Sequence, residues 1–422
     1  MTLRRSAAAL AATAVLGAVA APAAVAAPTP SPVALPSGLY GKGDPTYDGV
    51  FRQSLALLAQ DTVGVKPAAK AVDWLVGQQC DNGGFAAYRA DAGKACDPKD
   101  PKVMLDSNAT ASAVQALSAL GGQDAAAQKA VGWLRSVQNA DGGWPYVPGT
   151  PSDANSTSLV IGALVAAGEK PKDIKGKDWK SPLEALLDFQ VKCDGDASHQ
   201  GAFAFQPDKA KKLFPNADAT ASVVTASALK GLVVQAPKAA KELTVAPACK
   251  DGMTTPEAAV AGGADYLSRT LEKNGSHLKS AMPGAEDKPD FGNTADAVVA
   301  LAAGDYKAAA AKPAEWLAKN SAAWAKGAGP AAYAQLIFAA HATGMDPRSF
   351  GGADLVAQLN ATGPAPESQP GAGKDGTKDS AEEKKSDDGG STATWWIVGI
   401  AFVASMGAGF LISGRNKKNQ QL

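Results

Sequence analysis

Apolar residues recur along this chain at helical spacing, whereas the alternating pattern of a half-buried strand is nearly absent. Val131, Leu134 and Val137 are three residues apart, which places them on one face of a helix, and Gly142-Gly143 ends that helix. A second kind of stretch, such as residues 111–122 (ASAVQALSALGG), is rich in alanine, which allows helices to pack closely. Because the two kinds alternate, the pattern predicts a series of helical hairpins.

The hairpins are repeats of one unit. KAVDWLVGQQCDNGGF (residues 70–85) and KAVGWLRSVQNADGGW (residues 129–144) agree at the lysine, Trp-Leu, glutamine and Gly-Gly-aromatic positions. A repeat of this length indicates stacked supersecondary units within one large domain. We expect a partial unit and then complete units with these bounds: 50–60, 70–121, 129–168, 181–232, 259–304 and 313–344. The predicted fold class is all-α, with about five to six helical hairpins.

Both ends of the chain carry segments that we expect to lie outside this domain. Arg4-Arg5, an apolar run and Ala24-Val25-Ala26 are typical of an export signal with its cleavage site. Near the other end, 19 residues without a charge precede Arg415, Lys417 and Lys418, the pattern of a membrane-spanning helix with a cytoplasmic basic flank. The predicted order is signal peptide 1–26, ectodomain 40–360, disordered stalk 361–394, transmembrane helix 395–413 and cytoplasmic tail 414–422.

The stalk is predicted to be disordered because it is rich in Gly, Pro, Ser and charged residues and has too few large apolar residues to bury. The chain is therefore expected to be a single-pass protein of the cell membrane, with its ectodomain extracellular. Its formal charge is zero, with 41 basic and 41 acidic residues, so nucleic acid is not an expected partner.

Four cysteines lie in the part that is expected to be exported, where an even number indicates disulfides. Of the three pairings that four cysteines allow, we favour Cys80 with Cys96 and Cys193 with Cys249, because each closes a loop between neighbouring repeat elements. Zinc ligation by thiolates is the alternative. It is disfavoured because close C-x-x-C spacing is absent and the chain has only three histidines.

Short Asx-x-Asx-x-Thr motifs precede the alanine-rich helices, and residues 292–296 (GNTAD) are a degenerate copy. One interpretation is N-capping, in which side-chain oxygens accept the free amide N–H groups of the first helical turn. The other is a polar mouth for a ligand, or for a cation such as calcium, with aromatic residues of the glycine turns as its apolar rim. The candidate ligand-binding residues are Asp106, Asn108, Thr110, Asp153, Asn155, Thr157, Asn216, Asp218, Thr220, Asn293, Phe85, Tyr88, Trp144 and Tyr146.

The glycine turns also carry a more specific motif, in which a glutamine is followed by Asp-Gly and then by a tryptophan. The second copy of the repeat has the complete motif. The first copy has only part of it and ends in phenylalanine instead of tryptophan. The residues concerned are Trp74 and Gln79 in the first copy and Trp133, Gln138, Asp141, Gly142 and Trp144 in the second. This motif resembles the QW repeat of the prenyltransferase and squalene oxidase repeat family, here in a membrane-anchored member. The resemblance implies an α/α toroid, in which outer helices surround inner helices and a central cavity. It also implies that the QW residues are structural.

The catalytic motifs that accompany this fold are absent from the sequence. The DxDD string with which squalene and hopene cyclases protonate an alkene does not occur, and the nearest string is Asp194-Gly195-Asp196. The zinc site of protein prenyltransferases needs an unpaired cysteine near a histidine, whereas Cys193, near His199, is expected to be bridged. We therefore expect no catalytic residue, no metal and no cofactor.

These observations favour a non-catalytic cell-surface protein that binds a cofactor, lipid or glycan in its cavity and aids uptake, with a membrane transporter as its candidate partner. Two alternatives stay open. An enzyme of the terpenoid cyclase or prenyltransferase class requires a carboxylate or a metal inside the cavity. A structural or adhesion module requires a cavity that is filled by the protein's own side chains.

Overall fold

The computed structural model describes residues 35–43, 49–89, 91–192, 196–243, 253–281 and 285–367. These residues belong to one compact unit. The predicted signal peptide, transmembrane helix and cytoplasmic tail lie outside them, as does the stalk from residue 368 onward. Within the described ranges, no helix combines the length and the apolar character that crossing a bilayer requires.

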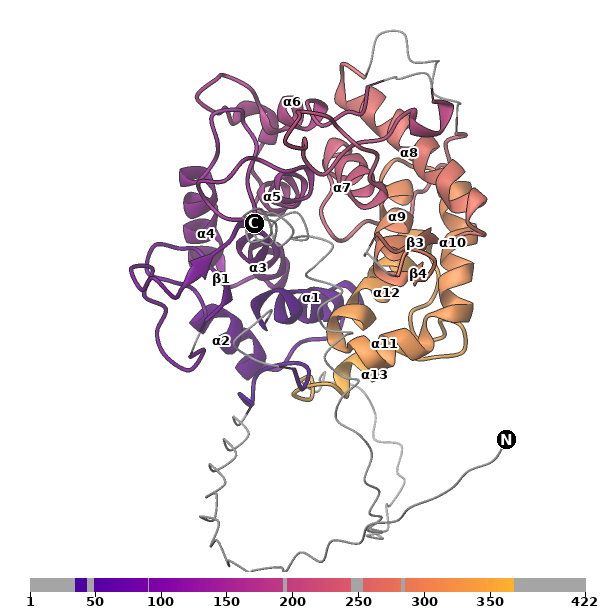
Figure 1. The fold of residues 1–422 in the computed structure, drawn as a ribbon. Helices are drawn as coiled ribbons and strands as arrows, with labels where there is room; N and C mark the ends of the chain where they lie inside the picture. Colours follow the sequence, from indigo (N-terminus) through magenta and orange to yellow (C-terminus); the bar gives the residue numbers. More distant parts are fainter. Residues whose placement is uncertain are drawn as a thin grey trace, which may run out of the picture. The chain divides into compact units, whose positions relative to one another are not determined.

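Six inner helices form a closed ring (Figure 1). Each packs against the next along the chain, and the last packs against the first. Their bounds are α1 Gly49–Thr62, α3 Ser107–Leu120, α5 Ala154–Ala166, α7 Ala217–Ser227, α9 Phe291–Ala303 and α12 Pro330–Thr343. They are buried on nearly all sides, which explains why they are rich in alanine and lack a clear polar face.

A second set of helices surrounds this ring and completes the hairpins (Figure 1). The outer helices are α2 Ala69–Gly77, α4 Asp124–Ser136, α6 Pro182–Leu187, α8 Pro256–Lys273, α10 Lys307–Asn320 and α13 Leu355–Asn360, and α11 Ala322–Ala328 links α10 to α12. Two short 3-10 helices are η1 Pro171–Asp173 and η2 Ala197–His199. The described part is therefore an all-α toroid of six helical hairpins, as the repeat pattern predicts.

Two small antiparallel hairpins decorate the turns between outer and inner helices. Strand β1 (Ala86–Tyr88) pairs with β2 (Met104–Leu105), and β3 (Leu278–Lys279) pairs with β4 (Pro289–Asp290). The loop that joins β1 and β2 is tied by a disulfide between Cys80 and Cys96, which confirms that predicted pairing. The other predicted pair, Cys193 with Cys249, lies outside the described residues.

The two ends of the described chain meet at the seam of the ring. The main-chain N–H of Gly41 donates to the carbonyl oxygen of Thr362 over 2.8 Å, and the Tyr40 hydroxyl donates to the carbonyl oxygen of Pro364 over 2.9 Å. Lys66 forms an ion pair with Glu367 at 2.7 Å. Residues 361–367, the beginning of the predicted stalk, are thus packed against the folded domain.

Candidate active site in the central cavity

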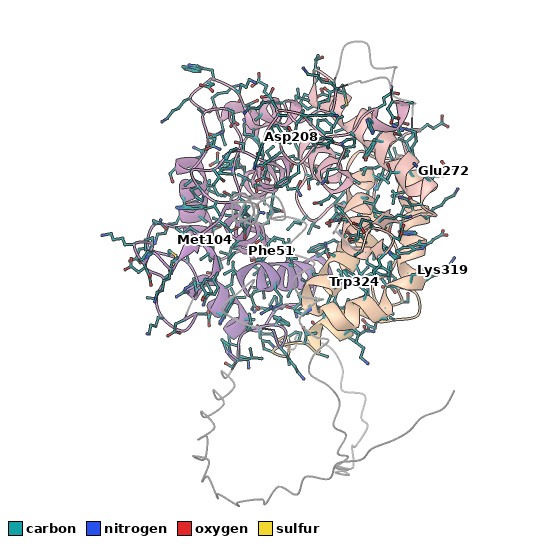
Figure 2. The ribbon with its side chains drawn as sticks, in the orientation of Figure 1. Phe51, Met104, Asp208, Glu272, Lys319 and Trp324 are labelled. Atoms are coloured by element: carbon teal, nitrogen blue, oxygen red, sulfur yellow. A yellow bond between two sulfur atoms is a disulfide. The ribbon has the colours of Figure 1, made fainter. Side chains whose placement is uncertain are left out.

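The ring encloses a cavity of about 90 Å³ that all six inner helices line. Figure 2 shows the labelled Phe51 on the side of α1 that faces the middle of the ring, whereas Glu272 and Lys319 lie at the outer edge of the molecule. Apolar and polar residues both line the cavity. The polar lining residues are Gln115, Asn155, Ser158, Asp218, Ser222, Thr225, Lys230, Asp296 and Gln335.

The lining residues follow a regular position count along each inner helix. Measured from the N-cap residue, the second, sixth and ninth positions share one helix face, because they are four and three residues apart. The second position supplies Asn155 and Asp218, and the sixth supplies Asp296 and Gln335. The ninth positions, which form a third layer of the cavity, are Gln115, Gly162, Thr225, Val299 and Phe338.

The loop that follows α7 lines the cavity near the C-terminal ends of the inner helices. The main-chain N–H of Leu232 donates to Gln115 Oε1 over 2.8 Å, which fixes the loop to α3. Gly231 and Gly162 lie so close that a Cβ atom on Gly162 would come within 2.9 Å of the Gly231 Cα atom. A Cβ atom on Gly231 would come within 2.3 Å of Gln115 Oε1, so a side chain there would displace the Gln115 amide.

Two carboxyl groups face the cavity, each held by an amide from a neighbouring helix. Asn155 Nδ2 on α5 donates to Asp218 Oδ2 on α7 over 2.6 Å. Gln335 Nε2 on α12 lies 3.2 Å from both carboxyl oxygens of Asp296 on α9. Both aspartates keep part of their surface accessible within the cavity. The two pairs form adjacent layers, one helical turn apart in position count.

Both carboxyl groups are harder to ionise than usual. Burial raises the pKa of Asp296 to about 8, the charge of Asp218 adds to this rise, and the hydrogen bond from Gln335 opposes it. Burial likewise raises the pKa of Asp218 to about 7, against the hydrogen bond from Asn155. Burial also raises the pKa of the nearby Asp290. At neutral pH, the cavity therefore contains a protonated carboxylic acid.

The first residue of each predicted Asx motif is an N-cap. Asp106, Asp153 and Asn216 accept the main-chain N–H of Ala109, Ser156 and Ala219 over 2.7, 2.6 and 2.8 Å. Asp153 is buried, and burial raises its pKa to about 7, but it does not line the cavity. The capping interpretation therefore describes these three positions.

The threonine of each motif fixes the glycine turn to the inner helix. The hydroxyl oxygens of Thr110, Thr157 and Thr220 accept, each over 2.9 Å, the main-chain N–H of an aromatic residue in the preceding turn. Those aromatic residues are Phe85, Trp144 and Phe203, which are fully buried.

Of the residues predicted to bind a ligand, Asn155 and Asp218 line the cavity. Phe85 and Trp144 belong to the core, and Tyr88 is exposed on β1.

The degenerate fourth motif is shifted by two residues from the predicted register. Its N-cap is Asp290, whose Oδ1 accepts the main-chain N–H of Asn293 over 3.0 Å, and Thr294 accepts the N–H of Leu278 over 2.9 Å. Asn293 is thus a partner of the cap and not the equivalent of Asn108. With the cap at Asp290, Asp296 falls at the sixth position and faces the cavity.

The QW residues hold turns together away from the cavity. Gln138 Nε2 donates to the Gly142 carbonyl oxygen over 2.8 Å, and Trp144 Nε1 donates to the Leu134 carbonyl oxygen over 2.7 Å. Gln79 Nε2 reaches the Ala126 carbonyl oxygen over 2.8 Å and so joins one repeat to the next. These hydrogen bonds join the glycine turns to the outer helices and one repeat to the next.

Asp296 and Gln335 are absent from the predicted site. A signal for both exists in the sequence, since each is a polar residue in an otherwise mainly apolar helix, where burial of a polar group must be offset. Among the described residues, no group of three or more His, Cys, Asp or Glu side chains is arranged to hold a metal ion.

No protein-family model and no curated protein sequence matches this chain. Several solved structures are similar to it. The type II terpene cyclase MstE from Scytonema, without ligand, is 16% identical, with 64% of this chain and 78% of that chain covered and a TM-score of 0.30. A variant of that cyclase in complex with its substrate, geranylgeranyl dihydroxybenzoate, gives 16% identity, coverage of 63% and 78%, and a TM-score of 0.30. A protein from Actinoplanes is 18% identical, with coverage of 66% and 82% and a TM-score of 0.29.

The interpretation of the chain as a non-catalytic cell-surface binding protein is wrong. That interpretation assumed that no proton donor lies in the cavity, whereas Asp218 and Asp296 both line it. The sequence search for a DxDD string missed them because they lie on different helices.

Proposed function

We propose that this chain is an acid-catalysing enzyme of the terpenoid cyclase class, which protonates an alkene at the end of a small apolar substrate. The observation that carries the proposal is the pair of carboxyl groups, Asp218 and Asp296, in an apolar cavity that holds them protonated near neutral pH. A general acid works best when its pKa lies near the operating pH.

Asp296 is the proposed proton donor. Its O–H bond breaks as a C–H bond forms at the alkene carbon, which leaves a carboxylate on Asp296 and a positive charge on the substrate. The Gln335 amide, 3.2 Å from both carboxyl oxygens, stabilises the carboxylate as it forms. The ring of helices and the loop at Leu232 would limit the access of bulk water to the cationic intermediate. Loss of a proton from a neighbouring carbon, back to the carboxylate, completes the cycle.

The size of the cavity limits the substrate. The 90 Å³ of space is smaller than an engineered apolar cavity of roughly 150 Å³ that accepts benzene. We therefore propose a short isoprenoid, or the reacting end of a longer one, as the substrate. The same small size favours a second candidate, a structural module with a filled ring. The buried carboxyl groups argue against it, because a purely structural ring would be filled at lower cost by apolar side chains.

The proposed location follows from the two ends of the chain. The export signal 1–26 and the anchor 395–413 would place the toroid at the outer face of the membrane. The Cys80–Cys96 disulfide fits that proposal, since disulfides persist in oxidising compartments.

Deuterium transfer tests the proposed function. The full chain, purified in a non-ionic detergent, is incubated in heavy water with prenol and geraniol, and products are analysed by mass spectrometry. Wild type is expected to form products with deuterium bound to carbon. Asp296→Asn and Asp218→Asn are expected to lose this activity, whereas Asp153→Asn, which changes a buried carboxyl outside the cavity and keeps a capping side chain, is expected to retain it. Failure of the wild type to transfer deuterium to either alcohol would contradict the proposal.

A further inference from the structure

Three buried oxygen atoms on the cavity wall have unused hydrogen-bonding capacity. Asn155 Oδ1, Ser158 Oγ and Gln335 Oε1 are buried and have no hydrogen-bond partner within the described ranges, and all three residues line the cavity. Each of these side chains is only 5% exposed. A buried acceptor without a donor costs about 1–3 kcal/mol, so a donor or a positive charge placed beside it is favoured.

The charged groups buried around the cavity are acidic. Asp218 lies on α7, Asp290 is the N-cap of α9 and Asp296 lies on α9, and the charges of Asp218 and Asp290 both hinder ionisation of Asp296. The one basic residue among the lining residues, Lys230, has an exposed side chain. Within the described structure, no cation offsets the carboxylates at the pH where both ionise.

The apolar part of the wall suits an organic cation better than a hydrated metal ion. Phe51 and Phe338 supply aromatic rings, and Leu55 and Val299 supply aliphatic surface. A positive charge is attracted to the face of an aromatic ring, and methyl groups on the cation gain from apolar burial. The cavity is smaller than one that accepts benzene, so only a few heavy atoms fit.

We propose that the central cavity binds a small alkylammonium ion, with the cationic nitrogen between Asp218 and Asp296 and its methyl groups against Phe51 and Phe338. This binding goes beyond the proposed acid catalysis and does not require turnover. The ammonium ion and the acidic proton compete for the same carboxyl groups, so the ion is also an inhibitor of any reaction that needs the protonated acid.

Titration calorimetry of the full chain in a non-ionic detergent tests the proposal, with tetramethylammonium chloride as the probe and tert-butanol as a neutral probe of similar size. Ionic strength is held constant with sodium chloride. Tetramethylammonium is expected to bind at least tenfold more tightly than tert-butanol at pH 8.5. Its affinity is expected to fall about tenfold at pH 6, because a carboxyl group with a pKa of about 7 is then mostly protonated.

Variants locate the site. Asp218→Asn and Asp296→Asn are each expected to weaken tetramethylammonium binding about tenfold or more, whereas Asp305→Asn, at an exposed ion pair with Lys241, leaves it unchanged. Thermal unfolding shows whether each variant is folded. If the cavity variants do not fold, the comparison of the two probes on wild type and the pH dependence of its affinity test the proposal. Equal affinity for the two probes, or an affinity that does not change between pH 6 and 8.5, overturns the proposal. Binding of the ion without deuterium transfer would refute the proposed function alone.

Discussion

The stability of the fold should depend on pH through Asp296, and replacing this residue with asparagine should reduce that dependence. The folded pKa, about 8, lies above the ordinary value of 3.8. Between these values, the folded state binds more protons at Asp296 than the unfolded state does, so the free energy of unfolding falls as the pH rises. The stabilisation is fully present below pH 3.8 and is lost as the pH passes through about 8.

The expected size of the effect follows from these two pKa values. Each unit of difference corresponds to about 1.4 kcal/mol when the two states differ by one proton. From pH 5 to pH 8, Asp296 alone is expected to lower the free energy of unfolding by about 3 to 4 kcal/mol. Asp218 and Asp153, whose pKa values are also raised, act in the same direction. Wild type should therefore be clearly less stable at pH 8 than at pH 5.

Asp296→Asn removes the titrating group and keeps its shape. The introduced amide can donate to Gln335 Oε1, which has no partner within the described ranges. Chemical denaturation at a series of pH values from 5 to 8 gives the free energy of unfolding at each pH. The fall in this free energy from pH 5 to pH 8 should be smaller in Asp296→Asn than in wild type by about 3 to 4 kcal/mol. Asp305→Asn, where the carboxyl group is half-exposed in an ion pair with Lys241, is the matched control and should keep the wild-type pH dependence. If Asp296→Asn also keeps that pH dependence, Asp296 is not a buried carboxyl with a raised pKa.

Three further changes test the scaffold by chemical denaturation. Gly142→Ala should cost about 1–3 kcal/mol, because φ is 86° and the new Cβ would lie 2.4 Å from a carbonyl oxygen, whereas Gly149→Ala, with φ of 85° but open space, should cost less. Thr157→Val should cost about 1–3 kcal/mol by removing the acceptor of a buried main-chain N–H. Replacing Cys80 and Cys96 with serine should cost about 3 kcal/mol for a separation of 16 residues, and a change near zero would refute this estimate.

The fold follows from the sequence more directly than the site does. Glycine turns, Asx caps and alanine-rich helices each have a local cause, so the hairpins can be predicted one at a time. The rotation of each inner helix about its axis has no such local signal. Helix α12 is buried on nearly every side, so its apolar pattern does not show which residues face the ring axis, and Gln335 was missed for this reason.

The N-cap residue gives a starting point for counting positions along each inner helix, and this count shows which residues face the ring axis. Counting from Asp153 and Asn216, the second position gives Asn155 and Asp218, which was enough to place both in the predicted site. In the fourth motif Asn293 was matched with Asn108, Asn155 and Asp218, although the second position after the Asp290 cap is Gly292. Counted from Asp290, Asp296 is at the sixth position and faces the cavity.

The corrected register explains why the two carboxyl groups occupy different layers. In α9 the second position after the cap is Gly292, which has no side chain, and the carboxyl group appears four residues later on the same face, at Asp296. Its amide partner Gln335 also occupies the sixth position of its helix. Each aspartate thus has an amide partner in its own layer. The repeat places two acids in adjacent layers of one cavity, where the charge of Asp218 hinders the ionisation of Asp296 and both carboxyl groups can face the same cation.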